Sequence, residues 1–112
     1  MTPRDIDTPP PERLLIDGPT GALAATLEVP TATTRGVVLL LHPHPEHGGS
    51  RRNNVVRHGA LGALESGCAS LRIDFRGAGD SDGEYDNGIG EVDDAATAAA
   101  WLRGRFPGLP LF

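Results

Sequence analysis

The chain has 112 residues, a formal net charge of −5 at pH 7 and an isoelectric point of about 5.2. This length suits one small domain, and the acidic balance argues against a nucleic-acid-binding protein, which usually carries a basic patch. The single cysteine, Cys68, excludes an internal disulfide, and no apolar run is long enough to cross a membrane. Because the first residues also lack the apolar core of a signal peptide, we expect a cytoplasmic protein without nucleic-acid or membrane partners.

The first third of the chain predicts a β-hairpin after a polar lead-in. Residues 1–11 are rich in proline and polar side chains and are expected to be disordered, so the domain is expected to span residues 12–112. Two apolar strands, 12–17 and 22–30, flank the turn sequence GPTG. The next strand, 37–41, is apolar on both faces, which is typical of a parallel strand covered by helices on both sides.

Helices and strands alternate in the remainder of the chain. We expect a helix over 55–67, a strand over 68–75, a helix over 91–106 and the start of a further strand at 109–112. The predicted apolar face of the first helix is Val56, Ala60, Ala63 and Leu64. That of the second is Val92, Ala95, Ala96, Ala99 and Leu102. This order predicts an α/β fold in which an antiparallel hairpin is followed by mainly parallel strands with flanking helices.

The sequence GDSDG, residues 79–83, matches the nucleophile-elbow pattern G-x-S-x-G of serine hydrolases. A functional elbow needs an apolar strand that runs directly into the serine and a helix that begins directly after it. Here five loop residues separate Phe75 from Ser81, and the following DGEYDNGIG is no helix start. Asp80 and Asp82 would also oppose a developing oxyanion. We therefore interpret Ser81 as a turn residue that imitates the motif.

A second candidate site is HPHPEHGG, residues 42–49, where three histidines follow a buried strand. Imidazoles at His42, His44 and His47 could together hold a zinc ion. The stretch is similar to the H-x-H-x-D-H-x-G-G motif of the metallo-β-lactamase family. It departs from that motif at Glu46, which replaces the aspartate, and at Gly48, which follows the last histidine directly. A metal-dependent hydrolase or metal-binding protein is therefore an alternative function.

The Gly- and Asp-rich loop over 76–90 offers no cofactor site. It contains no G-x-G-x-x-G followed by a helix, and its alternating acids do not complete a calcium-loop pattern. We expect no cofactor.

Two longer stretches together resemble a known family. These are LLLHPHPEHGGSRRNNVV and ASLRIDFRGAGDSDGEYDNGIGEVDDAATAAAWL. Jointly they are similar to the N-terminal half of an α/β-hydrolase, in particular to the small predicted hydrolases related to dienelactone hydrolase and CocE-type enzymes. The resemblance runs from the strand before His42 to Trp101 and fits the hairpin that precedes it.

The resemblance implies a serine-type hydrolase that cleaves an ester or a related acyl bond of a small molecule. In that family the serine corresponding to Ser81 is not the nucleophile, and the elbow comes on the next strand. The nucleophile, acid and histidine would then follow Phe112, so the chain alone is expected to be inactive. The loop after the strand 37–41 would supply an oxyanion-hole N–H. Pro43 and Pro45 have no N–H, whereas His44 and Glu46 do, and we assign the role to His44 by its position after the strand.

A third alternative is a non-catalytic interaction module. In the hydrolase sheet the strand 37–41 pairs with the strand expected to begin at 109–112. If that partner is incomplete, an apolar strand edge is open, and we expect edge-to-edge self-association.

Overall fold

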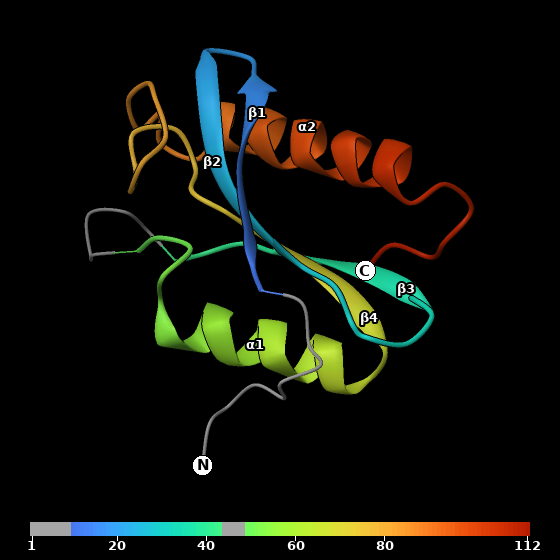
Figure 1. Ribbon diagram of the computed structural model, residues 1–112. Helices are drawn as coiled ribbons and strands as arrows, with labels where there is room; N and C mark the ends of the chain where they lie inside the picture. The colour runs from blue at the N-terminus through green and yellow to red at the C-terminus, as the bar shows by residue number, and fades with distance from the viewer. Residues whose placement is uncertain (1–9, 44–48) are drawn as a thin grey trace.

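The computed structural model describes residues 10–43 and 49–112 (Figure 1). These residues form, in chain order, β1 (Glu12–Gly18), β2 (Gly21–Glu28), β3 (Gly36–Leu40), α1 (Asn54–Glu65), β4 (Cys68–Ile73) and α2 (Ile89–Arg105). The predicted order of strands and helices is therefore confirmed. The last expected strand is represented by Leu111, which forms a parallel bridge with Val37.

The four strands form one mixed sheet in the order β1-β2-β4-β3. β1 and β2 make the predicted antiparallel hairpin, with Gly18 opposite Gly21 at the turn. β2 then pairs antiparallel with β4, and β4 pairs parallel with β3. On the other side of β3, the Val37 N–H donates to the Pro110 carbonyl at 2.9 Å and the Leu39 N–H to the Phe112 carbonyl at 2.9 Å. The hairpin is thus followed by parallel strands, as expected.

The two helices lie on opposite faces of the sheet (Figure 1). α1 packs on β3 and β4, whereas α2 packs on β1 and β3. α1 begins after Asn53, whose side chain accepts the Val55 N–H at 2.9 Å. It ends before Gly67, whose φ of +83° is a left-handed conformation that closes a helix.

The main core lies between the sheet and α2. It is aliphatic, and its fully or almost fully buried members include Leu23, Leu27, Leu71, Ile73, Ala98 and Leu102. The smaller layer under α1 buries Val56, Ala60 and Ala63, as predicted.

The predicted apolar face of α2 is partly wrong. Leu102 is fully buried, but Val92 is 66% exposed, and the buried residues of the first turns include Glu91 and Asp94. The helix is rotated relative to the expectation because these two carboxylates bind groups of the loop that follows β4. A hydrophobic pattern cannot reveal such a rotation, since it counts acids as solvent-facing. In the described ranges, neither helix has the length and apolarity that a membrane-spanning segment needs.

Candidate active site

A pocket opens at the carboxyl ends of the parallel strands β3 and β4, the edge at which open α/β sheets usually bind ligands. Its volume is about 400 Å³. The lining comes from the end of β3, the loop after β4 and the start of α2, and comprises Leu41, His42, Pro43, Phe75, Tyr85, Gly88, Glu91, Val92 and Ala95. Most of these side chains are apolar, so the pocket is suited to the non-polar part of a small substrate.

His42 lines this pocket and is buried, and hydrogen bonds occupy both of its ring nitrogens. Nε2 accepts the Phe75 backbone N–H at 2.9 Å, and Nδ1 lies 2.7 Å from the Pro43 carbonyl oxygen. Because Nε2 is an acceptor, this network assigns the proton to Nδ1, which donates to Pro43. The ring also packs edge-on against the Phe75 ring, with centroids 4.9 Å apart. His42 therefore holds the ends of β3 and β4 together.

This arrangement leaves His42 with no lone pair for a metal ion. The other two candidate ligands, His44 and His47, lie outside the described residues. Within residues 10–43 and 49–112, no three histidine, cysteine or acidic side chains are grouped as a metal site requires.

Asp74 connects the segment before α1 to the loop after β4. It follows β4 directly and has no solvent exposure. Its Oδ1 accepts the Arg51 backbone N–H at 2.7 Å, and its Oδ2 accepts the Asp80 N–H at 2.9 Å and pairs with the Arg51 guanidinium. Gly79 passes so close to this carboxylate, with φ of +49°, that a Cβ atom would overlap it. The first glycine of GDSDG is thus required by packing.

The Arg51 guanidinium also reaches Asp80, at 3.1 Å, and Arg52 reaches the same oxygen at 2.8 Å. The hydrogen bond from Arg51, together with the charge of Arg52, holds the pKa of the Asp80 carboxyl below its ordinary value. Four side chains, those of Arg51, Arg52, Asp74 and Asp80, therefore hold the segment before α1 against the loop after β4.

A second buried ion pair joins the same loop to α2. Asp94 accepts the backbone N–H of Arg76 at 3.0 Å, its Nε at 3.0 Å and its Nη2 at 2.8 Å. The hydrogen bonds to Asp94 raise the pKa of Arg76 above its ordinary value. Glu91 completes the junction by accepting the N–H groups of Asp86 at 2.7 Å and Gly88 at 2.9 Å, so that α2 begins at Ile89.

Sequence reasoning missed the pair of Arg76 and Asp94. The available signal was an arginine directly after a strand and an acid in the first turns of the next helix.

Ser81 lies in the loop between β4 and α2. Its Oγ donates to the Asp74 carbonyl at 2.6 Å and accepts the Ala24 N–H at 2.8 Å. Since β4 ends at Ile73 and α2 begins only at Ile89, this serine is not on a turn between a strand and an immediately following helix. The hydroxyl instead joins the loop to β2.

The fold and the position of the pocket place the chain in the class of α/β serine hydrolases. An α/β serine hydrolase homologue from Coxiella burnetii is 37% identical, with a TM-score of 0.86, over 89% of this chain and 49% of that chain. An α/β serine hydrolase without a lid from Xanthomonas campestris is 35% identical, with a TM-score of 0.86, over 90% of this chain and 48% of that chain. The chain thus spans about half the length of these structures.

A curated relative, an uncharacterized protein from Rickettsia prowazekii (strain Madrid E), is 38% identical over 95 residues, which are 85% of this chain and 40% of that protein. The family model described as X-Pro dipeptidyl-peptidase (S15 family) matches residues 17–109. The chain belongs to this family. These findings confirm the resemblance to part of an α/β-hydrolase and give no support to a metal-dependent hydrolase or an interaction module.

Proposed function

We propose that these residues form one side of the active centre of a serine-type hydrolase that cleaves an ester or related acyl bond of a small molecule through an acyl-enzyme. The observation that carries the proposal is the apolar pocket at the carboxyl ends of β3 and β4, next to the loop that begins at His42. In this fold the loop after that strand supplies one oxyanion donor, and the apolar lining receives the acyl or alcohol part of the substrate.

The nucleophile, the acid and the base of the triad would lie outside these 112 residues. Two observations support this proposal. The related structures are about twice as long as this chain, and the hydroxyl of Ser81 and both ring nitrogens of His42 are already engaged. The chain alone should therefore be inactive, and a fluorophosphonate probe should leave it unlabelled. Labelling at Ser81 would overturn this assignment.

We assign the oxyanion-hole N–H to His44, which lies outside the described residues. The support is its position three residues after the pocket-lining Leu41 and between two prolines, which have no N–H to donate. The imidazole itself would then be dispensable, whereas the backbone N–H would not.

The two roles are separable by a matched pair of variants in a protein that joins this chain to the segment carrying the nucleophile. His44→Pro removes the N–H and should lower kcat for a p-nitrophenyl ester about 10²- to 10³-fold, the usual effect of losing one oxyanion donor. His44→Ala keeps the N–H and should change kcat only a few-fold. Equal losses in both variants would show that the side chain acts, and unchanged kcat in both would remove His44 from the site.

Two further assignments accompany this function. A cytoplasmic location is supported by the single free cysteine, Cys68, since secreted domains of this size usually rely on disulfides. Self-association through a sheet edge is supported by the short pairing of β3 with residues 110–112, which involves the backbone of Val37 and Leu39. Sedimentation velocity over a range of concentrations tests it, and a concentration-independent monomer would refute it.

A further inference from the structure

Half of the basic side chains in the sequence line a single pocket on the sheet face that carries α1. Because α1 packs on β3 and β4, no helix of the described residues covers the same face over β1 and β2 (Figure 1). A pocket of about 270 Å³ lies there. Its lining includes five of the ten arginines of this acidic chain, namely Arg13, Arg51, Arg52, Arg57 and Arg72. This concentration of one charge sign points to an anionic ligand.

The carboxylates of the protein neutralise only part of this charge. Arg51 and Arg52 pair with Asp74 and Asp80, and Arg72 pairs with Glu28 at 3.1 Å. Arg13 and Arg57 have no ion pair within residues 10–43 and 49–112. Among the described residues, five guanidiniums therefore face three carboxylates, which leaves an excess of two positive charges around the pocket.

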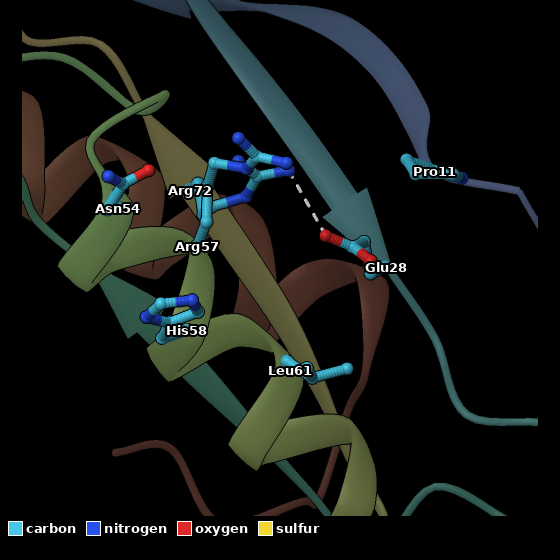
Figure 2. A pocket seen from close by; sticks show the side chains of 7 residues that line it. All are labelled: Pro11, Glu28, Asn54, Arg57, His58, Leu61 and Arg72. Carbon is cyan, nitrogen blue, oxygen red and sulfur yellow. Dashed lines mark hydrogen bonds and ion pairs between the residues drawn. The ribbon is translucent and has the colours of Figure 1, made fainter. Parts of the chain in front are cut away.

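Arg72 provides an independent sign of a missing partner. It is only 9% exposed, and its buried Nε has no hydrogen-bond acceptor in the described part of the protein. Burial, together with the charges of Arg57 and Arg51, lowers the pKa of Arg72 despite the opposing effect of Glu28. Figure 2 shows the guanidiniums of Arg57 and Arg72 extending from α1 and β4 toward β2. An acceptor placed between them would relieve both the repulsion and the unmet hydrogen bond.

We propose that this arginine pocket binds a phosphate group, carried by a small organic phosphate or present as free phosphate. A phosphate monoester has a charge of roughly −1.5 to −2 at pH 7, which matches the excess of two positive charges. Its oxygens accept paired hydrogen bonds from guanidinium forks, the geometry for which arginine is preferred over lysine. The first turn of α1, which also has no acidic residue, adds the positive end of the helix dipole.

A second pocket, of about 400 Å³, adjoins the first and shares Arg57 and Arg72 with it. Its other walls include Leu61, His58 and Pro11, so it offers a less charged space for an organic group (Figure 2). This arrangement favours a phosphate monoester over free phosphate. The pocket lies on the α1 face and is distinct from the proposed acyl pocket, which contains none of the five arginines.

Isothermal titration calorimetry in phosphate-free buffer at low salt tests the proposal with two probes, phenyl phosphate and inorganic phosphate. Arg57→Gln removes an exposed arginine of the pocket, so the fold should survive, as unchanged thermal melting would confirm. We expect it to weaken binding by about tenfold or more, as the loss of a charge-assisted contact does. Arg103→Gln is the matched control, because Arg103 is an exposed arginine on α2, at the opposite face of the sheet.

Specific loss of binding in Arg57→Gln with either probe supports the site. Tighter binding of phenyl phosphate identifies an organic phosphate as the ligand, and equal binding identifies free phosphate. The proposal is overturned if neither probe binds at millimolar concentration, or if Arg57→Gln and Arg103→Gln weaken binding equally. Tighter, Arg57-dependent binding of a single-stranded oligonucleotide would also overturn it, by replacing a small ligand with a nucleic acid.

Discussion

Replacing Asp94 with alanine is expected to destabilise the protein severely. Asp94 has no solvent exposure and accepts three hydrogen bonds from Arg76, one from the backbone and two from the guanidinium. The substitution leaves a buried guanidinium whose remaining hydrogen bond within the described residues goes to the Gly90 carbonyl, at 2.8 Å. Removing one member of a buried ion pair costs about 3–5 kcal/mol, a large part of the ~5–15 kcal/mol that stabilises a typical domain.

Urea unfolding followed by circular dichroism measures this effect. Asp93→Ala is the matched control, because Asp93 is the exposed neighbour on the same helix, and it should change the free energy of unfolding by about 0.5 kcal/mol or less. The double variant Asp94→Ala with Arg76→Leu should recover much of the loss, since it removes the unpaired charge as well. If Asp94→Ala were no more destabilising than Asp93→Ala, the pair would not hold α2 to the sheet.

Three further outcomes follow from the loop after β4 and from α1. Gly79→Ala should lower the stability measured by thermal melting by about 1–3 kcal/mol, because it strains a left-handed residue against the buried Asp74 carboxylate. Gly62→Ala, whose added Cβ would lie in open space on α1, should raise stability by about 0.5–1 kcal/mol. NMR titration should find the Asp80 carboxyl titrating below its ordinary pKa and moving upward in Arg52→Ala. The stability that depends on ionised Asp80 is fully present above the pKa that this carboxyl has in the unfolded chain. It is lost as the pH falls through the lower pKa of the folded protein. Arg52→Ala should therefore also make stability depend less steeply on pH on the acid side. Ser81→Ala should lower the free energy of unfolding by about 1–3 kcal/mol, because it leaves the Ala24 N–H of β2 unpaired. In a protein that also carries the nucleophile, the esterase activity per folded molecule should not change. A loss of turnover would show that the serine is catalytic.

Local signals in the sequence were sufficient for most of the fold. The turn GPTG between two apolar strands predicted the hairpin, and the uninterrupted apolar run 37–41 predicted a parallel strand with helices on both faces. The glycine at position 67 suits the left-handed turn that follows α1. Each of these features depends on neighbours within a few residues, so a linear sequence contains the relevant physics.

The partners of the charged residues depended on the tertiary structure. Asp74 and Arg51 are adjacent only because a parallel crossover brings the end of β4 beside the segment before α1. Asp94 and Glu91 are acids at a helix start, where the helix dipole alone accounts for them in the sequence. In the folded chain they are buried and rotate α2, which leaves Val92 66% exposed.

Local patterns in the chain were enough to predict the order of the elements, the family resemblance and a serine of GDSDG that lacks the context of an elbow. Packing between distant segments determined which side chains meet. It occupied both ring nitrogens of His42, formed the apolar pocket that His42 lines and gathered five arginines around one pocket beside α1. The physical reason is that backbone conformation and capping are short-range effects. Ion pairing and pocket lining require residues that are distant in the sequence, and only the packed sheet and its two helices bring them together.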